Sequence, residues 1–448
     1  MANNIGWGSI YSVTNWGKGV INNISWGKIY ADLVGVLPSF ALNFANISTD
    51  FTFTRNSSST RVNEQGLIET VSDNTPRIDY SSGEGAFLLE PASTNLLPYS
   101  EGFTVAEGWS NTRLLAIPNS TVSPNGIMEG TKLVENTDFN SRNVTDLLNS
   151  TGSGDTVVGS VFVKKADHDY IMIKIIDNAA NVNGELNYYR VSFNIANGTF
   201  NADLPTGSPI NPFYNIEDYG NGWYRISVGL TKKNNAVRTD FEIQLVNSGA
   251  NAPNPVYQGD GVSGTYIWGA QVEALPHATS YIPTNGSIAT RAGELCLGAT
   301  PTINSEEGVL YAEISSLEEV SSSNKYLSLS DKTYNNRVSI LYNLAGTNQI
   351  RVFLRVGGVV QTDRILNVSD VTDINKVAIS YKQGELKIYL NGSLSNSVSG
   401  SVWAADTLTD LSFSEIGSSL APFYGRSKGL RVYTEALTDD ELVALTTI

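Results

Sequence analysis

Apolar and polar residues alternate with a period of two along most of the chain. Between residues 96 and 295 the alternating runs are separated by Gly, Asn and Pro, and their apolar positions include Val161/Val163, Ile171/Ile173/Ile175, Tyr224/Ile226/Val228 and Phe241/Ile243/Leu245. Successive side chains of a strand point to opposite faces, so this pattern is typical of antiparallel strands with one buried face. The turn residues between the runs predict an antiparallel sandwich.

Residues 296–448 form a second block of the same kind. Residues 350–356 alternate as far as Gly357-Gly358, and residues 386–390 lead into Asn391-Gly392. Both dipeptides supply the positive backbone angles that two-residue hairpins need, and Asn-Gly is the strongest local hairpin signal. The block therefore predicts a second antiparallel sandwich.

A single helix is well marked, close to the C-terminus. Thr438 is a candidate N-cap, and Glu441 follows three residues later, as in a capping box. Leu437 and Leu442 have the spacing of a hydrophobic staple around that cap. We therefore expect a short helix beginning after Thr438 in an otherwise all-β chain.

The patterns divide the chain into four segments. We expect an all-β fold with an N-terminal docking segment and two β-sandwiches, at residues 1–45 (docking segment), 46–95 (short β connector), 96–295 (jelly-roll sandwich) and 296–448 (second sandwich).

The first segment contains an internal repeat. Asn4–Tyr11 returns as Asn23–Tyr30 with six of eight positions identical, and a third Trp-Gly pair lies between the copies at Trp16. So short a segment has no second layer against which to bury three indoles. We predict that it docks on a sister chain or another protein, through Trp7, Tyr11, Trp16, Trp26 and Tyr30. A flexible tail remains the alternative.

Composition and charge exclude several classes of function. Lys and Arg number 29 against 44 Asp and Glu, which gives a net charge of −15 without any basic run. This argues against nucleic acid as a partner. The start of the chain lacks the pattern of a secretory signal, and no apolar run is long enough to insert into a membrane. Two His and one Cys exclude a disulfide framework and the usual zinc sites.

Catalysis finds little support in the sequence. The acidic pairs are adjacent in the chain, so on a strand their carboxylates would point to opposite faces: Glu217-Asp218, Glu306-Glu307, Glu318-Glu319 and Asp439-Asp440. We interpret them as solvated carboxylates rather than the acid pair of a glycosidase. His168 and His277 are interpreted as solvated or structural rather than as general bases. We therefore predict no catalytic residues and no enzyme activity.

Several short motifs give the chain a family resemblance. They are Phe53-Thr-Arg55, Gly66-Leu-Ile68, Pro76-Arg77, Gly85–Glu90, Ser93–Leu97, Gly220–Arg225, Tyr266–Glu273 and Thr279–Pro283 in the first part, and Ile388–Gly392, Phe423–Gly425, Leu430–Tyr433 and Ala436–Asp439 in the last. The first set resembles modules of bacteriophage tail and fibre proteins, including a jelly roll like that of carbohydrate-binding modules. The second set is similar to concanavalin A-like, laminin-G-type sandwiches. The Trp-Gly repeats resemble virion-docking segments of head or tail fibres of podovirus-like phages.

The resemblance implies a virion protein made in the host cytoplasm. Its partners would be two further copies of itself in a homotrimer, a capsid or tail protein, and glycans of the host surface. Three functions follow from it: a structural fibre protomer, a dedicated carbohydrate-binding receptor protein, and a polysaccharide depolymerase.

Candidate ligand-binding residues lie in both sandwiches. Sugar binding uses aromatic platforms and loop amides, for which Trp403, Tyr424 and Asn391 are the candidates, with core packing as the alternative for Trp403. Trp223 and Trp268 lie within strand patterns and are interpreted as core. No cofactor is expected. A structural calcium remains open from the resemblance, with Asp155 and Asp260 as candidate ligands and a role as turn residues as the alternative.

Overall fold

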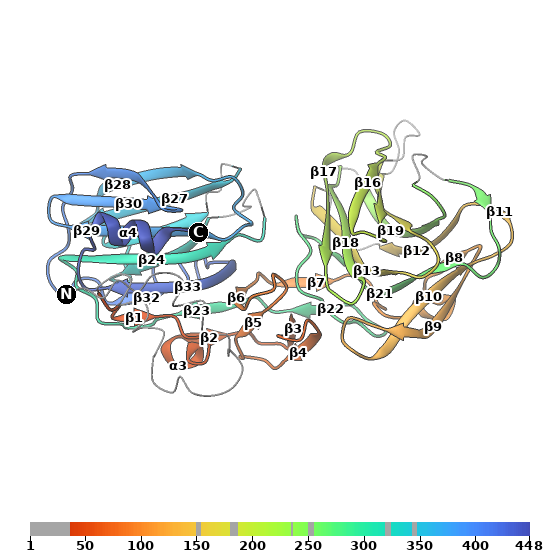
Figure 1. The fold of residues 1–448 in the computed structure, drawn as a ribbon, viewed down its shortest axis with the longest axis horizontal. Coiled ribbons are helices and arrows are strands. Elements are labelled where there is room, and N and C mark those ends of the chain that lie inside the picture. The colour runs from red at the N-terminus through yellow and green to blue at the C-terminus, as the bar shows by residue number, and fades with distance from the viewer. Residues whose placement is uncertain are drawn as a thin grey trace, which may run out of the picture.

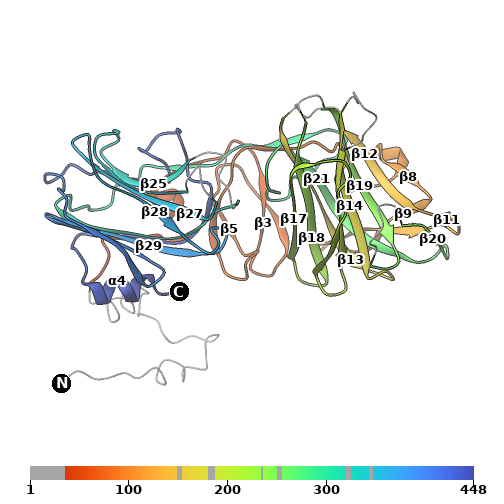
Figure 2. The same ribbon diagram turned by 90° about the horizontal axis from the view of Figure 1, so that it is seen from above.

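The computed structural model describes residues 36–148, 154–179, 187–233, 236–249, 255–318, 324–342 and 347–448. Two β-sandwiches lie side by side along the long axis, and a small β region lies between them (Figures 1 and 2). Within the described residues, no helix has the length and apolarity needed to cross a membrane. Trp7, Tyr11, Trp16, Trp26 and Tyr30, predicted to dock, lie outside the described residues.

The C-terminal sandwich packs an eight-stranded sheet on a five-stranded one. In spatial order the eight-stranded sheet is β31 (Ser393–Val398), β30 (Glu385–Leu390), β29 (Asn375–Lys382), β24 (Glu307–Ser315), β33 (Gly425–Tyr433), β6 (Ala86–Leu89) and β5 (Arg77–Asp79), with β1 (Phe40–Ala41) also paired to β33. The five-stranded sheet is β28 (Val359–Asn367), β27 (Gln349–Val356), β26 (Arg337–Tyr342), β25 (Lys325–Ser330) and β32 (Asp410–Ser412).

The central sandwich consists of two six-stranded antiparallel sheets. One contains β17 (Ile210–Asp218), β18 (Trp223–Thr231), β13 (Thr156–Lys165), β21 (Gly264–Glu273), β10 (Met128–Glu135) and β9 (Leu114–Val122). The other contains β16 (Thr199–Asp203), β15 (Asn187–Asn194), β14 (Tyr170–Ala179), β19 (Ala236–Val246), β12 (Arg142–Leu148) and β8 (Ser110–Thr112). The alternating apolar positions that the sequence predicts to face inward, such as Val161, Ile173, Ile226 and Ile243, are fully buried between the sheets.

Short strands and helices complete the described structure. Four two-stranded ladders join β2 (Thr52–Thr54) to β23 (Leu295–Leu297), β22 (Ala289–Arg291) to β7 (Ser93–Asn95), β3 (Ser59–Val62) to β4 (Ile68–Val71), and β11 (Phe139–Asn140) to β20 (Tyr257–Gln258). The helices are α3 (Ile47–Asp50), the 3₁₀ turn η1 (Val105–Glu107) and α4 (Asp439–Thr446). The all-β fold class predicted from the sequence is therefore confirmed.

The local signals in the C-terminal sandwich form the predicted structures. Asn391 and Gly392 have φ of 47° and 79° in the hairpin between β30 and β31, where only residues that tolerate positive φ fit without strain. The Thr438 side chain caps α4 by accepting a hydrogen bond from the N–H of Glu441, and the Glu441 side chain accepts one from the backbone N–H of Thr438. Leu442 is fully buried against the eight-stranded sheet, so the helix is held by packing as well as by its cap.

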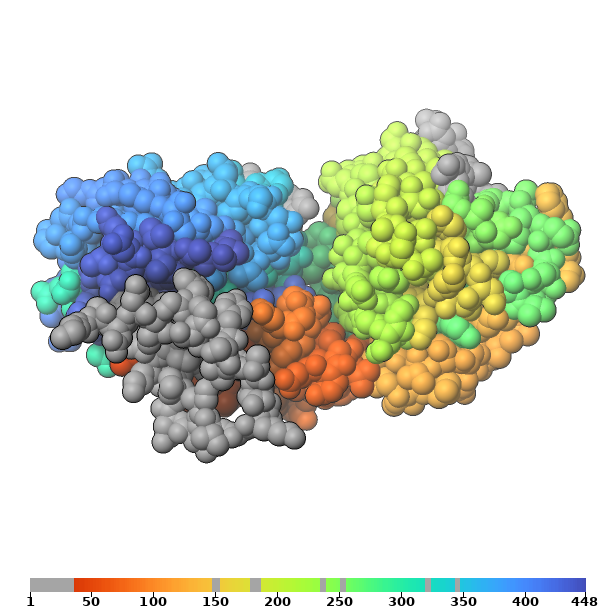
Figure 3. Space-filling view, in the orientation of Figure 1, coloured from red at the N-terminus to blue at the C-terminus, as the bar shows by residue number. Residues whose placement is uncertain are grey.

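Part of the predicted short β connector, residues 46–95, extends the C-terminal sandwich. β5 and β6 extend the eight-stranded sheet through β33, and Phe51, Phe87 and Leu89 are buried in the core of the C-terminal sandwich. The strand pattern of so short a segment cannot show which sheet it will extend, because its pairing partner lies more than 300 residues away in the sequence. In Figure 3 the connector, in orange, lies between the two sandwiches.

The hairpin of β3 and β4 covers one outer face of the central sandwich. Phe162, Trp223 and Trp268 project from this face and are at most 1% exposed, because Val62 and Ile68 of the hairpin pack over them. Burying side chains of this size contributes about 2–3 kcal/mol each. The interpretation of Trp223 and Trp268 as core residues is confirmed.

Five buried charges join the connector to the returning chain; we call them the joint. Arg77 donates to both Glu294 oxygens at 2.9 and 2.6 Å and to Glu90 at 2.8 Å, and Arg55 donates to Glu294 at 2.7 Å. Arg291 lies 3.5 Å from Glu90. None of these side chains is more than 4% exposed. Because Arg and carboxylate planes match in this geometry, the two glutamates compensate most of the charge of the three arginines.

The joint keeps Glu90 ionised. Burial opposes its charge, but the nearby charges of Arg291 and Arg77, together with hydrogen bonds from Ser280, hold the pKa of Glu90 well below its ordinary value of 4.5.

Replacing Glu294 by Gln should destabilise the protein strongly. The substitution keeps the shape but leaves Arg55 and Arg77 buried without their shared counter-charge, which costs roughly 3–5 kcal/mol of the free energy of unfolding. Urea denaturation of the full chain measures this. Glu84→Gln is the matched control, because its pair with Lys428 is exposed and should contribute nothing measurable. Equal effects of the two substitutions would contradict the role of the joint.

Stability should also fall in acid through Glu90. Its pKa is lower in the folded state than in the unfolded state, so its contribution is complete above the ordinary value of 4.5 and is lost as the pH falls towards the folded-state pKa. Between about pH 7 and about pH 3, the free energy of unfolding of Glu90→Gln should therefore depend less on pH than that of the unaltered chain. Urea titrations at a series of pH values test this, and parallel pH profiles would refute it.

Candidate functional site

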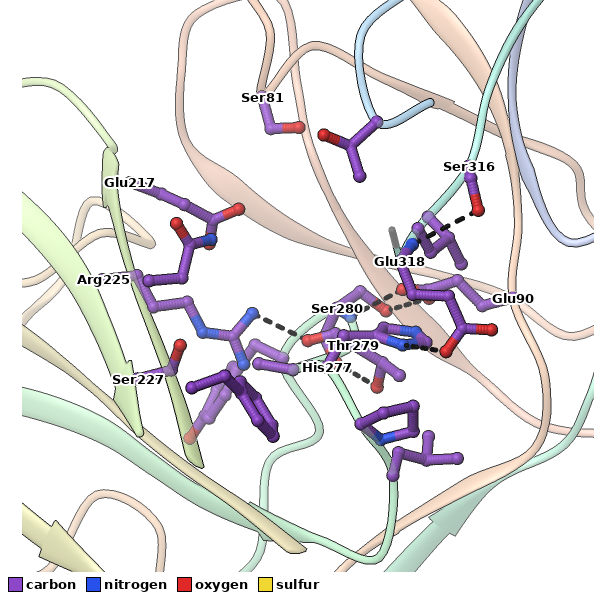
Figure 4. Close-up of a pocket in the computed structure, with 18 of the residues that line it drawn as sticks. Ser81, Glu90, Glu217, Arg225, Ser227, His277, Thr279, Ser280, Ser316 and Glu318 are labelled. Carbon is purple, nitrogen blue, oxygen red and sulfur yellow. Dashed lines mark hydrogen bonds and ion pairs between the residues drawn. The ribbon is translucent and has the colours of Figure 1, made fainter. Parts of the chain in front are cut away.

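A cleft of about 1180 Å³ opens between the two sandwiches. Its lining comes from β17 and β18 of the central sandwich, from the connector, from residues 274–281, and from residues 316–318 of the C-terminal sandwich. Figure 4 shows Glu217, Arg225 and Ser227 on one side, and Ser316 and Glu318 on the other. Clefts between domains are common ligand sites because each side contributes groups that the other lacks.

Strand alternation positions the wall formed by β17 and β18. Ile216 and Ile226 face the core of the central sandwich, so Glu217 and its cross-strand partner Arg225 face outward, into the cleft. Phe213 lies farther along the same wall, with its ring over Gly229. A Cβ at Gly229 would lie 2.1 Å from the ring, so the flat position of Phe213 depends on that glycine.

Arg225 is fixed in this wall. Its guanidinium donates to the carbonyl of Thr279 at 2.7 Å and to the hydroxyl of Ser160 at 3.0 Å, and it lies 5.3 Å from the ring centre of Phe162. Burial lowers the pKa of Arg225, but the neighbouring Tyr219 and Glu217 outweigh burial and raise it. The arginine is therefore a permanent, rigid cation behind the cleft surface.

The opposite side carries a charged cluster from two domains. His277 Nδ1 lies 3.6 Å from Glu318 Oε2, and Lys325 forms an ion pair with the same carboxylate. Burial opposes ionisation of Glu318, but His277 and Lys325 lower its pKa to about 2. This carboxylate is thus charged at neutral pH and cannot serve there as a proton donor.

Two of the carboxylates that line the cleft are held as anions. A glycosidase needs one carboxyl group whose pKa is raised so that it can protonate the leaving oxygen. Among the described cleft carboxylates, Glu90 and Glu318 have lowered pKa values and are held by cations. Glu217 and Asn215 remain exposed at the surface, where they can accept and donate hydrogen bonds to hydroxyl groups.

The three predicted sugar-binding residues do not line this cleft and do not meet. Trp403 is 3% exposed, with its ring against Tyr381 and its Nε1 donating to the carbonyl of Arg355 at 2.9 Å. It belongs to the core of the C-terminal sandwich, so the platform role is wrong and the alternative of core packing holds. Tyr424 is half-buried against the same core. The side chain of Asn391 accepts a hydrogen bond from the backbone N–H of Lys376, in β29, at 2.9 Å.

The two candidate calcium ligands lie at opposite ends of one sheet. Asp155 precedes β13, and Asp260 precedes β21, the strand that runs antiparallel beside it. The Asp260 carboxylate accepts hydrogen bonds from the backbone of Val262 and Ser263 and from the Ser263 hydroxyl. This turn geometry lowers its pKa and matches the alternative reading as a turn residue. No group of three acidic, His or Cys side chains suited to a metal occurs among the described residues.

The two histidines lie in different surroundings. His168 is buried and lies 3.1 Å from Glu135, which also accepts a hydrogen bond from Tyr257 at 2.6 Å. His277 lies in the cleft beside Glu318, between the central and C-terminal sandwiches. Cys296 is fully buried, and burial raises the pKa of its thiol well above the ordinary value.

Most of the cleft lining was not predicted from the sequence, although Asp155, a candidate calcium ligand, lies in it. The sequence pattern placed Glu217 in a solvated pair and gave no role to Phe213 or Arg225. The available signal was strand alternation, which places Glu217 and Arg225 on the faces of β17 and β18 that point away from the core. That signal does not show that another domain lies opposite.

Comparison with known proteins identifies one part of the chain. Residues 315–443 match the family model of the concanavalin A-like lectin/glucanases superfamily. No curated protein sequence matches the chain.

Solved structures with similar folds include sugar-binding modules and a sialidase. The CBM40 of the Ruminococcus gnavus IT-sialidase, bound to α2,3-sialyllactose, is 21% identical over 32% of this chain and 83% of its own, with a TM-score of 0.28. Domain 4 of AbnA, an arabinanase from Geobacillus stearothermophilus, in complex with arabinotriose, is 16% identical over 35% and 77%, with a TM-score of 0.26. Trypanosoma rangeli sialidase is 12% identical over 70% and 60%, with a TM-score of 0.26.

Likenesses this distant carry no argument about what the chain binds. Neither the family match nor these structures support the predicted phage fibre or homotrimer, both of which stay predictions. The all-β chain thus carries, over residues 315–443, a domain of the concanavalin A-like lectin/glucanase type.

Proposed function

We propose that this chain is a glycan-binding adhesion protein that holds an oligosaccharide in the cleft between its two sandwiches without cleaving it. The observation that carries the proposal is the lining of the cleft, which combines a half-buried aromatic ring, Phe213, with exposed amide and carboxylate groups, Asn215 and Glu217. Such a mixture suits a sugar, whose C–H face is apolar and whose rim carries hydroxyl groups. The lectin-type domain on the other side of the cleft is consistent with this role.

Two of the cleft carboxylates support binding without turnover. Glu318 keeps a pKa of about 2, and Glu90 is neutralised by arginines, so neither has a proton to give at neutral pH. Polysaccharide depolymerisation is therefore the less favoured alternative.

Binding of a glycan by the full chain should depend on Phe213 and Glu217. Phe213→Ala removes the apolar wall and Glu217→Gln removes a charged acceptor, and each should weaken binding roughly tenfold. A glycan array identifies the ligand, and isothermal titration calorimetry on the best one gives the affinities. The bound polysaccharide should be recovered at unchanged length.

Glu435→Gln is the matched control, since this exposed acid lies outside the cleft lining. The proposal fails if the full chain binds no glycan, if both cleft variants bind as the unaltered chain does, or if oligosaccharides are released.

We propose a virion appendage as the setting of this function. The sequence observation that favours it is the Trp-Gly repeat of residues 4–30, which has no interior of its own and suits docking to a particle. The resemblance to phage fibre proteins points the same way. The chain would then act in adhesion of a virus to a host glycan, with sister chains and a capsid or tail protein as partners.

Changing Trp7, Trp16 and Trp26 together to Ala should abolish attachment to the particle. The three indoles would provide most of the apolar docking surface, and truncating such anchors usually costs several kcal/mol of binding free energy. Immunogold labelling of purified particles by electron microscopy measures incorporation. Normal incorporation of the triple variant, with glycan binding intact, would reject the docking role.

A further inference from the structure

One rim of the C-terminal sandwich brings together a loop and a hairpin. The loop between β25 and β26 contains Asn335 and Asn336, and the hairpin between β27 and β28 contains Gly357 and Gly358. The N–H of Gly357 donates to Asn336 Oδ1 at 2.8 Å, and the N–H of Gly358 donates to the carbonyl of Asn335 at 3.0 Å. These bonds fix the rim and with it the side chains that flank it.

Three arginines gather beside this rim on the outer face of the five-stranded sheet. The guanidinium carbons of Arg337, Arg355 and Arg351 lie 4.9, 5.2 and 5.9 Å from the ring centre of Phe353. A cation over an aromatic face is stabilised, but like charges opposite each other across two strands repel. Arg337 and Arg355 are direct cross-strand partners. Such a cluster is notable in a chain of net charge −15.

The arginines differ in how their charges are compensated. Arg351 forms a two-pronged pair with Asp363, at 2.7 and 2.6 Å, and Arg337 lies 3.0 Å from Glu415. Among the described residues, no carboxylate lies within ion-pair distance of Arg355, whose Nη1 donates only to the carbonyl of Tyr334 at 3.3 Å. Its buried Nε has no hydrogen-bond partner in the described structure. Arg355 is half-buried and reachable from solvent.

Tyr334 adds an exposed aromatic surface to the same spot. Its residue is 44% exposed, and its ring centre lies 5.3 Å from the guanidinium of Arg337. The carbonyl of Tyr334 also accepts a hydrogen bond from Arg337 at 3.1 Å. Because both arginines bind this one carbonyl, the position of Tyr334 beside Arg355 is set by the sheet.

We propose that Tyr334 and Arg355 form a second carbohydrate site, which takes a sugar bearing a carboxylate, with Arg337 as a fixed neighbouring charge. Arg355 would bind the carboxylate through its planar guanidinium, and the Tyr334 ring would lie against the apolar face of the sugar. Arginine is suited to this because its paired donors match a carboxylate. An anion here would also relieve the repulsion between Arg337 and Arg355.

The net charge of the chain favours a single acidic sugar over a long polyanion as the ligand of this site. A long polyanion such as nucleic acid needs an extended basic surface, which a chain of net charge −15 does not offer. A single acidic sugar needs only the local cluster. The site lies outside the lining of the cleft, so this inference goes beyond the cleft proposal and does not depend on it.

Titration of the full chain with oligogalacturonate tests the site, and the methyl-esterified oligomer is the matched ligand without charge. The acidic oligomer should bind, and esterification or Arg355→Gln should each weaken binding roughly tenfold or more. Tyr334→Ala should also weaken binding. Arg364→Gln removes an exposed arginine from β28, at the edge of the same sheet, and should leave binding unchanged.

The controls separate this site from the cleft and from loss of folding. Glu217→Gln should retain binding of the acidic oligomer, and Arg355→Lys, which keeps the charge, should bind better than Arg355→Gln. The proposal is overturned if the acidic oligomer does not bind, if the ester or dextran sulfate binds equally well, or if Arg355→Gln behaves like Arg364→Gln. Loss of binding in Glu217→Gln alone would assign the acidic sugar to the cleft instead.

Discussion

The arrangement of the two sandwiches depends on the ion pairs that three buried arginines form with two buried glutamates. Arg55 and Arg77 come from the connector, Glu294 from the chain that returns to it, and each charge would be costly to bury alone. Together the two glutamates offset two of the three positive charges of the arginines. A site of this kind tolerates little rearrangement, because moving one partner leaves the others unpaired in an apolar environment. The two chain crossings between the sandwiches are therefore tied at one place.

The joint is coupled to apolar packing on both sides. Towards the C-terminal sandwich, Phe87 and Leu89 continue its sheet and core. Towards the central sandwich, Val62 and Ile68 cover the aromatic face formed by Phe162 and its neighbours. The connector thus belongs partly to each sandwich. This double attachment keeps the two walls of the cleft opposite each other, as a binding site built from two domains requires.

The two proposed sites differ in how many of their charged groups are already paired within the protein. In the cleft, the strongest charges are already matched within the protein: Arg225 is held by Thr279 and Ser160, and Glu318 by Lys325 and His277. The surface left to a ligand is polar and includes the exposed carboxylate of Glu217. At the rim, by contrast, Arg355 has no acidic partner among the described residues, so that surface favours an anion.

The sequence by itself determined the local structure. Period-two alternation placed the inward residues of the central sandwich, Asn391-Gly392 formed its hairpin, and Thr438 with Glu441 capped the helix. These outcomes depend on side-chain periodicity and backbone angles, which act over a few residues. The sequence also carried the motifs containing Arg55, Arg77 and Glu90, although their spacing gave no hint that they meet.

Only the tertiary structure decided which faces are covered and which charges are paired. Trp403 lies in a stretch without a clear pattern, and only its packing against Tyr381 shows that it is core rather than a sugar platform. Phe213, Glu217 and Arg225 became a cleft wall because another domain lies across from them, and Arg55 met Glu294 across 239 residues of sequence. Alternation tells how a strand is oriented relative to its own sheet. It contains no information about what packs on the other side, since that contact is made by residues distant in the chain.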